Sequence, residues 1–305
     1  QTRGWFYTLH AISTLVFNNI SYKNVISNGL VLDKNGQKMS KRLGNAPDPF
    51  KIIDEYGPDA TRWYMISNSN PWDNLKFDVN GINEVQRKFF GTLFNIFSFF
   101  SLYANIDKFS YKEKFISLDK RPEMDQWIIS ELNSLIKKVD FAYNDYEPTK
   151  VTRMISDFVQ EKLSNWYVRL NRRRFWKGDY TKDKISAYQT LFDCLKTIAK
   201  LSSPIAPFYM DHLYQDLISV TSNNISSVHI SSFPKWDKSF INIDLENKIN
   251  KARNITSLAL SIRKKEQIKV RQPLKKLIIP VKNNNEKKLI ESIQDQLISE
   301  INIKK

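Results

Sequence analysis

The densest run of side chains that could do chemistry lies at residues 38–45, which read KMSKRLGN. Lys38 and Lys41 bracket Met39 and Ser40, and Arg42 follows directly. Cationic groups on a short loop suit a polyphosphate, because its charge must be stabilised during a reaction and the product must then be released. The alternative is an ordinary solvated turn that happens to carry lysines.

The turn before this run has a recognisable sequence. Residues 33–36 read DKNG, and Asn-Gly readily accepts the positive φ values of a primed two-residue turn. We therefore expect a hairpin with a primed turn at these residues, leading directly into the lysine loop.

A second set of basic side chains falls at helical spacing. Arg169, Arg172, Arg173 and Trp176 occur at i, i+3, i+4 and i+7, so they share one side of a helix. Guanidinium groups bind phosphate through paired hydrogen bonds, and flat aromatic rings stack on unpaired bases, so this side could bind RNA. Alternatively, each arginine pairs with an acidic neighbour inside the protein. Another side of the same helix is apolar and is expected in the core: Val159, Leu163, Trp166, Tyr167 and Leu170.

The composition favours a polyanionic partner. The 305 residues include 47 Lys and Arg against 32 Asp and Glu, a formal net charge of +15. The hydrophobic fraction of 41% is enough for more than one folded core. Cys194 is the only cysteine, which excludes an intrachain disulfide and a cysteine-based zinc site in this chain. The three histidines lack acidic or cysteine neighbours at ligand spacing, so no metal site is expected.

The pattern of apolar residues predicts a mostly α fold. Short β-prone runs at 25–26 and 30–32 precede the lysine loop, and helices start near Asp48 and Pro58, which suits the end of an α/β nucleotide-binding domain. Helical spacing then dominates, as in an all-α bundle. The predicted helices are 4–17, 81–105, 122–143, 148–177, 182–202, 206–220, 246–266 and 286–300, with strand-like residues at 270 and 277–279.

One stretch resembles a membrane span. Residues 89–106 carry no charge and are rich in phenylalanine. Gly91, Asn95, Ser98 and Asn105 nevertheless form a polar stripe at close to helical spacing. We therefore expect a buried helix of the bundle here.

The lysine loop resembles the KMSKS signature of the class I aminoacyl-tRNA synthetases, with Arg42 in place of the last serine. Four further blocks follow the same resemblance, in order along the chain. Gln1–Tyr7 is similar to the segment that follows an acidic residue of the catalytic core in this class. Asn165–Trp176 resembles the isoleucine-specific branch in particular, and Ser227–Pro234 and Lys269–Leu274 fit the same branch.

This resemblance implies a role for each part of the chain. Residues 1–80 would be the end of a Rossmann-type catalytic domain with the KMSKS loop and a helical junction. Residues 81–235 would be the anticodon-binding bundle, and residues 236–305 an incomplete, small α/β segment. Lys41 would be the main contact to the phosphates of ATP, Lys38 a second, and Met39 and Ser40 would shape the loop. Arg169, Arg172, Arg173, Arg174 and Trp176 would contact tRNA.

The resemblance also implies the partners. These are ATP with Mg²⁺, isoleucine and an isoleucine-accepting tRNA, for a monomeric cytoplasmic enzyme. The class has an HIGH-type ATP motif, an amino-acid pocket and an editing insertion ahead of the residues matched here. We therefore expect the chain to be part of a longer ligase and to be inactive alone. The alternatives are a valine or leucine enzyme, or a non-catalytic basic helical module that binds RNA.

Overall fold

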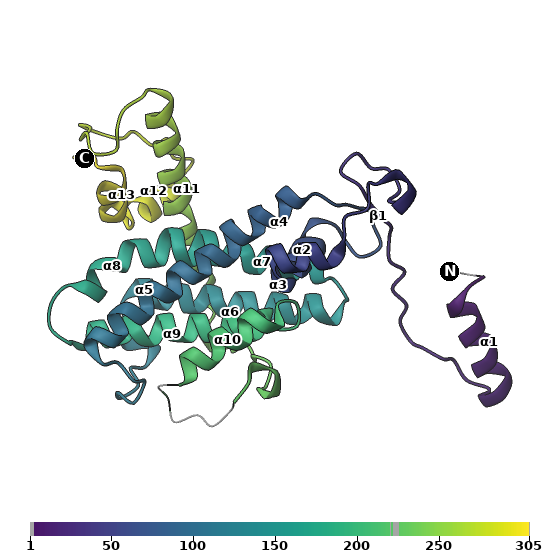
Figure 1. Cartoon of the computed structure of the whole chain (residues 1–305). Helices are drawn as coiled ribbons and strands as arrows, with labels where there is room; N and C mark the ends of the chain where they lie inside the picture. Colours follow the sequence, from purple (N-terminus) through teal and green to yellow (C-terminus); the bar gives the residue numbers. More distant parts are fainter. Residues whose placement is uncertain (1–2, 220, 222–225, 305) are drawn as a thin grey trace. The chain divides into compact units, whose positions relative to one another are not determined.

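A computed structural model describes residues 3–219, 221 and 226–304, apart from the side chain of Lys41, and it is mostly helical (Figure 1). The strands among those residues are β1 (Val31–Leu32) and β2 (Leu75–Lys76). The helices are α1 (Trp5–Phe17), α2 (Pro49–Tyr56), α3 (Pro58–Asn68), α4 (Val79–Val85), α5 (Gly91–Asp107), α6 (Glu123–Asn144), α7 (Pro148–Asp157), α8 (Arg169–Trp176), α9 (Lys182–Ser202), α10 (Pro207–Ile218), α11 (Ile243–Lys265), α12 (Asn284–Glu291) and α13 (Gln294–Ile301). Wider π-helical turns at Gln86–Phe90 and Phe158–Val168 join α4 to α5 and α7 to α8.

The chain divides into two compact units. The first unit comprises Gln1–Phe99, Lys138–Gln160 and Leu195–Pro234. The second unit comprises Phe100–Lys137, Glu161–Cys194 and Lys235–Lys305.

Helix α3 is the centre of the first unit, where it packs against α2, α4, α7 and α10. Its Trp63 is buried, stacks on Phe89 with ring centroids 4.1 Å apart, and donates from Nε1 to Ser156 Oγ at 3.2 Å. Asp59, also buried, accepts the backbone N–H of Tyr209 in the first turn of α10 at 2.6 Å. Burial raises the pKa of Asp59. The α3 side chains therefore fix both the packing of the unit and the position of α10.

A close backbone approach positions the strand that precedes the lysine loop. β1 pairs with β2 in parallel, with Val31 opposite Leu75. Upstream, Gly29 donates its N–H to the Pro71 carbonyl at 2.9 Å, and a Cβ at Gly29 would lie 2.1 Å from the Asp73 carbonyl oxygen. Only glycine fits here without moving the backbone. The predicted strand at 25–26 is wrong, because those residues pair with no strand.

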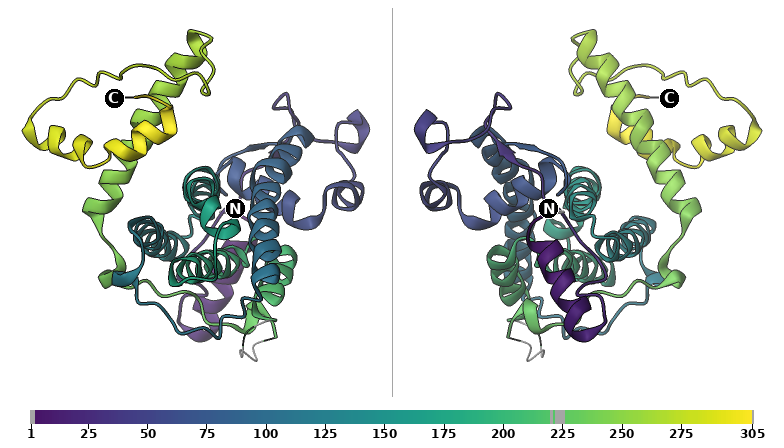
Figure 2. Two further views of the ribbon diagram at one scale, coloured as in Figure 1. Left: turned by 90° about the vertical axis from the view of Figure 1, so that its left-hand side faces the viewer. Right: turned by 90° about the vertical axis from the view of Figure 1, so that its right-hand side faces the viewer.

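The second unit buries large aromatic side chains and several polar groups. Trp127 on α6 and Tyr188 on α9 are fully buried. Glu246 on α11 is buried too, and it accepts from Ser130 Oγ at 2.6 Å and Ser134 Oγ at 2.8 Å, both on α6. α12 and α13 pack against α11, as Figure 2 shows from two sides. The unit is thus built from helices held by both apolar and hydrogen-bonded contacts.

Most predicted helices form, and the mostly α prediction is confirmed. The predicted strand at 277–279 is wrong: these residues are irregular, and Leu277 and Ile279 line an apolar hollow beside α12 and α13. The nearest ladder contact is a single bridge between Leu274 and Ile303. The predicted helix 286–300 breaks at 292–293 into α12 and α13. Val220, the last residue of the predicted helix 206–220, lies outside the described residues, as do Gln1 and Thr2 of the block Gln1–Tyr7.

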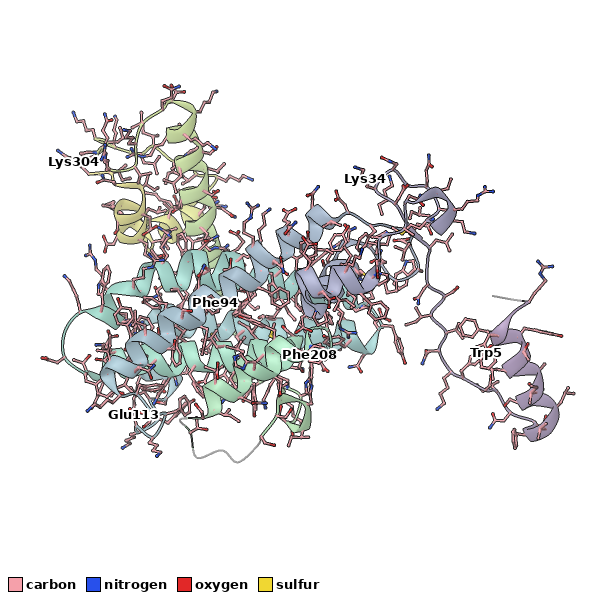
Figure 3. All side chains as sticks on the ribbon, viewed as in Figure 1. Trp5, Lys34, Phe94, Glu113, Phe208 and Lys304 are labelled. Atoms are coloured by element: carbon pink, nitrogen blue, oxygen red, sulfur yellow. The ribbon has the colours of Figure 1, made fainter. Side chains whose placement is uncertain are left out.

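The apolar stretch at 89–106 is a helix with two different sides. By length and composition alone, Val79–Asp107 could cross a membrane, and a third of its apolar window is buried. Leu93, Ile96 and Phe100 are buried, as expected for a bundle helix. Phe94, labelled in Figure 3, is 56% exposed, and Leu102 is also exposed. The expectation of burial therefore holds for one side of the helix.

We predict that Trp63→Ala destabilises the protein by about 3–5 kcal/mol, because it leaves a cavity against Phe89 and removes the hydrogen bond to Ser156. Urea denaturation followed by far-UV circular dichroism measures the loss. Phe94→Ala is the matched control, since an exposed ring leaves no cavity, and it should change stability by less than about 0.5 kcal/mol. Equal effects of the two substitutions would contradict this view of the core.

Candidate phosphate loop and nucleic-acid interface

The turn before the lysine loop is held by Asp33. Its Oδ1 accepts the backbone N–H groups of Asn35 at 2.9 Å and Gln37 at 2.8 Å, and its carbonyl accepts that of Gly36 at 2.9 Å. Gly36 has a φ of 81°, whereas Asn35 is not in the left-handed region. The prediction of a primed turn is therefore wrong. The chain makes a turn with negative φ at its central residues, followed by a glycine in the left-handed region. The hydrogen bond from the Gln37 backbone lowers the pKa of Asp33, and the hydrogen bond from Asn45 lowers it further.

Asn45 connects both ends of the loop through one amide. Its Oδ1 accepts the backbone N–H of Ser40 at 2.9 Å. Its Nδ2 donates to Asp33 Oδ2 at 2.9 Å and to the Lys38 carbonyl at 3.3 Å. Lys38 also bridges antiparallel to Leu32 at the end of β1. The backbone that carries KMSK is thus fixed to the strand before any ligand binds.

The cationic side chains of the loop face solvent where they are described. Lys38 and Arg42 are exposed, Met39 and Ser40 are half-buried, and Lys34 projects from the turn (Figure 3). The side chain of Lys41 lies outside the described residues. Within the described part of the chain, no carboxylate pairs with Lys38 or Arg42. The loop therefore combines a fixed backbone with cations that are available to an anion.

Arg174 has a different environment from the other arginines of α8. Its two terminal nitrogens, Nη1 and Nη2, donate to the two oxygens of Asp125 at 2.7 and 2.9 Å, and its Nε donates to Asp183 at 3.0 Å. Nη1 also reaches Asn171, and Nη2 reaches Ser186. These contacts occupy all five N–H groups of the guanidinium.

Asp125 is the buried centre of that network. It is fully buried and also accepts from Tyr167 Oη at 2.8 Å and from Ser186 Oγ at 3.0 Å. Burial raises the pKa of Tyr167 well above its usual range, and the charge of Asp125 adds to it. The hydrogen bonds to Asp125 raise the pKa of Arg174 against the opposing effect of burial. Asp125 therefore holds α6, α8 and α9 in one arrangement.

The remaining predicted RNA-contacting residues fall into two groups. Arg169 forms an ion pair with Glu300 and donates from Nε to the Asn165 carbonyl at 2.8 Å. Arg172 and Arg173 are exposed, and no described acidic side chain pairs with either. Trp176 is 56% exposed, one turn further along α8. The structure thus brings Arg172, Arg173 and Trp176 together as an unpaired basic and aromatic surface, which we call the α8 surface.

Sequence reasoning missed the two residues that organise these sites. Asn45 closes the lysine loop. It was recognisable from the sequence as an asparagine directly after Gly44, because asparagine side chains commonly form hydrogen bonds to the backbone of a nearby turn. Asp125 was recognisable as an acidic residue in the first turn of a helix, two positions before the buried Trp127. Among described residues, no three His, Cys, Asp or Glu side chains lie close enough to share a metal ion.

We predict that Arg174→Gln destabilises the protein by about 3–5 kcal/mol, because it leaves the Asp125 carboxylate buried without its charged partner. Arg172→Gln, on the same helix, should change stability by less than about 0.5 kcal/mol. Urea denaturation monitored by tryptophan fluorescence compares the two. If Arg172→Gln proved as costly as Arg174→Gln, the division between inward and outward arginines would be incorrect.

Two family profiles match the chain in order. The family described as tRNA synthetases class I (I, L, M and V) matches residues 1–78. The family described as anticodon-binding domain of tRNA ligase matches residues 125–279, which is half of the chain. The first match contains the lysine loop, and the second contains α8.

Curated relatives match along all 305 residues. Isoleucine–tRNA ligases of Bacteroides fragilis, Cytophaga hutchinsonii and Dehalococcoides mccartyi are 61%, 58% and 44% identical to it. The chain covers 27%, 28% and 30% of those proteins, so it spans little more than a quarter of the length of the curated relatives it matches.

A solved structure has the same fold. It is the ternary complex of Agrobacterium radiobacter K84 agnB2 LeuRS with tRNA and LeuAMS. The alignment has a TM-score of 0.57 at 18% identity and covers 78% of this chain and 28% of that one. Together with the profile that matches half of the residues, this likeness agrees with the helical architecture described above. The chain belongs to the tRNA ligase family that carries this anticodon-binding domain.

Proposed function

We propose that this chain works within an isoleucine–tRNA ligase, which activates isoleucine with ATP to isoleucyl-adenylate and transfers it to isoleucine-accepting tRNA. The observation that carries the proposal is the match of the whole chain, at 57–61% identity, to several proteins of that name. The proposed setting is the cytoplasm, and the proposed state is a monomer.

The lysine loop is proposed to bind the phosphates of ATP. When the α-phosphorus is attacked, negative charge develops on the departing pyrophosphate, and ammonium groups aimed there stabilise the transition state. Lys41 is the proposed main contact, Lys38 the second, and Met39 and Ser40 shape the loop between them. The hydrogen bonds of Asn45 to the backbone of Ser40 and Lys38 support this role, because a fixed backbone reduces the entropy lost when the lysines are oriented toward the phosphates. Mg²⁺ is proposed to enter with ATP, held by its phosphates.

The α8 surface is proposed to bind tRNA. Arg172 and Arg173 are exposed cations without a described acidic partner, and the Trp176 indole offers a flat face for an unpaired base. Arg169 takes part less, because Glu300 already neutralises it. Arg174 is left out of the proposed contact, because its donors are used within the protein. The proposed domains are the catalytic end at 1–80, the anticodon-binding bundle at 81–235 and a third segment at 236–305.

We predict that Lys41→Ala, in a ligase containing this chain, lowers isoleucine-dependent ATP–pyrophosphate exchange about a hundredfold or more, the usual cost of removing one transition-state donor. Lys34→Ala, on the preceding turn, is the control and should leave exchange within about twofold. Unchanged exchange in the Lys41 variant would refute the assignment of the loop.

We predict that the double substitution Arg172→Gln, Arg173→Gln weakens binding of isoleucine-accepting tRNA about tenfold at low salt. It should also reduce the slope of log affinity against log salt by about two, since each lost phosphate contact removes about one unit. Fluorescence anisotropy with labelled tRNA across a salt series measures both quantities.

The control for this pair removes two charges elsewhere. Lys88→Gln with Lys150→Gln takes away exposed lysines that already pair with Glu84 and Glu147. It should leave the salt slope nearly unchanged. Equal losses from both pairs would mean that net charge alone, and not the α8 surface, attracts the tRNA.

A further inference from the structure

The lysine loop is closed by a contact between two side chains, Asp33 and Asn45. Asn45 Nδ2 donates to Asp33 Oδ2 at 2.9 Å, and the same amide nitrogen donates to the Lys38 carbonyl at 3.3 Å. The Oδ1 of Asn45 accepts the backbone N–H of Ser40 at 2.9 Å. One asparagine thus joins the aspartate before the loop to the two residues that flank Met39.

Asp33 is the fixed end of this contact. It directly follows β1, and Phe77, directly after β2, donates its N–H to the Leu32 carbonyl at 2.8 Å. Tyr64 on α3 donates its hydroxyl to the Lys76 carbonyl of β2 at 3.0 Å. All of these residues belong to the first unit. The aspartate is therefore connected through the two strands to α3, the centre of that unit.

The contact also closes the turn that carries Lys41. A 3₁₀ turn spans Lys41–Leu43, and its last residue donates its N–H to the Ser40 carbonyl at 3.1 Å. Gly44 follows with a φ of 65°, in the left-handed region, and the Asn45 side chain then reaches the Ser40 N–H. Residues 40–45 thus form a closed ring of backbone and side chain. Because the backbone of Lys41 is part of this ring, the Asp33–Asn45 contact fixes its position relative to β1.

The donor and the acceptor of the contact are defined by their other partners. Asp33 Oδ1 already accepts the N–H groups of Asn35 and Gln37, so its Oδ2 is left for Asn45. Ser40 occupies the Oδ1 of Asn45, so the asparagine presents its NH₂ group to the carboxylate. Asn45→Asp would therefore place two carboxylates in contact, and like charges at that distance repel. Adding Asp33→Asn would restore one donor and one acceptor, with their order reversed.

We propose that Asp33 and Asn45 are positioning residues for ATP. They act through the backbone of the loop and not through contact with the nucleotide. A loop that is ordered before binding loses less entropy when its side chains close on the phosphates, so the contact lowers the KM for ATP. The inference rests on the proposed function, because it takes the lysine loop as the site that meets ATP.

The kinetic test measures ATP–pyrophosphate exchange in the ligase that contains this chain, with ATP and isoleucine varied separately. We expect Asn45→Ala to raise the KM for ATP about tenfold, and Asn45→Asp to raise it further, because an unordered loop must be ordered by the ligand. The KM for isoleucine should stay within about twofold in both variants. The double substitution Asp33→Asn, Asn45→Asp should return the KM for ATP to within about threefold of the unmodified enzyme.

Asn70→Ala is the matched control for these variants. Asn70 makes the same kind of contact, from Nδ2 to Asp73 Oδ2 at 2.9 Å, but outside the loop. Its replacement should leave the KM for ATP within about twofold, since no hydrogen bond of the lysine loop is lost.

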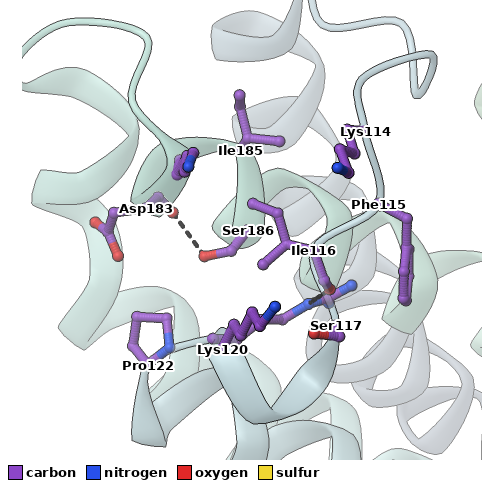
Figure 4. Close-up of a pocket in the computed structure, with 11 residues that line it drawn as sticks. Lys114, Phe115, Ile116, Ser117, Lys120, Pro122, Asp183, Ile185 and Ser186 are labelled. Atoms are coloured by element: carbon purple, nitrogen blue, oxygen red, sulfur yellow. Dashed lines mark hydrogen bonds between the residues drawn. The ribbon is translucent and has the colours of Figure 1, made fainter.

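Limited proteolysis tests the order of the loop apart from catalysis. Trypsin cleaves after lysine and arginine where the backbone opens locally. We expect Asn45→Ala to speed cleavage after Lys38 or Arg42 about fivefold or more. Cleavage after Lys114 is the internal reference, because this exposed lysine lies on the irregular segment that lines a pocket of the second unit (Figure 4). Its rate should be the same in both proteins, as measured by mass spectrometry of the fragments.

The outcomes separate this inference from the proposed function. If Lys41→Ala abolishes exchange but both Asn45 variants match Asn70→Ala in their KM for ATP, the inference is overturned and the proposed function stands. Equal rises in the KM for ATP and for isoleucine also overturn it, as does a double substitution no better than Asn45→Asp. If Lys41→Ala leaves exchange unchanged while the double substitution reverses the effect of Asn45→Asp, the positioning contact stands and the assignment of Lys41 fails. All variants are assayed below their measured unfolding midpoints.

Discussion

The second unit depends on one buried carboxylate. Asp125 has no exposed surface, and a carboxylate in that position is tolerated only with charged and hydrogen-bonding partners. Those partners come from three segments: Arg174 on α8, Ser186 on α9 and Tyr167 in the π-helical turns before α8. Because all of them must reach the same two oxygens, the rotation of α8 about its axis is fixed. Arg173 and Arg172 then lie about 100° and 200° around the helix axis from Arg174.

That geometry explains why the basic residues of α8 differ in role. Arg174 is used inside the protein, so Arg172 and Arg173 are directed elsewhere and remain exposed. The lysine loop follows the same physical logic on a smaller scale. Asn45 satisfies the backbone of Lys38 and Ser40, and the described cations of the loop stay unpaired. The buried carboxylate of Asp125 fixes α8 in one place, and the neutral amide of Asn45 fixes the backbone of the loop in the other. In both places the neighbouring cationic side chains stay exposed and can bind an anion from outside the protein.

The helices could be predicted because their signals are local. Asp48 before Pro49 and Gly57 before Pro58 mark the starts of α2 and α3, and apolar spacing marks the long helices. The predictions that failed concern residues whose structure is set by partners distant in sequence or by hydrogen bonds other than those expected. Residues 277–279 have strand-like composition but no strand beside them, so Leu277 and Ile279 line the hollow beside α12 and α13 while Ile278 is exposed. Arg174 matched an RNA-binding pattern, yet its partner Asp125 lies 49 residues away and is not visible from local spacing.

We propose that this chain belongs to an enzyme that activates isoleucine, and the most direct test of that proposal is amino-acid-dependent ATP–pyrophosphate exchange. The enzyme containing this chain is assayed with isoleucine, valine and leucine in parallel, each at matched concentration. We expect isoleucine to support the fastest exchange, with the highest kcat/KM of the three. A higher kcat/KM with leucine or valine, or no exchange with any of them, would contradict the claim.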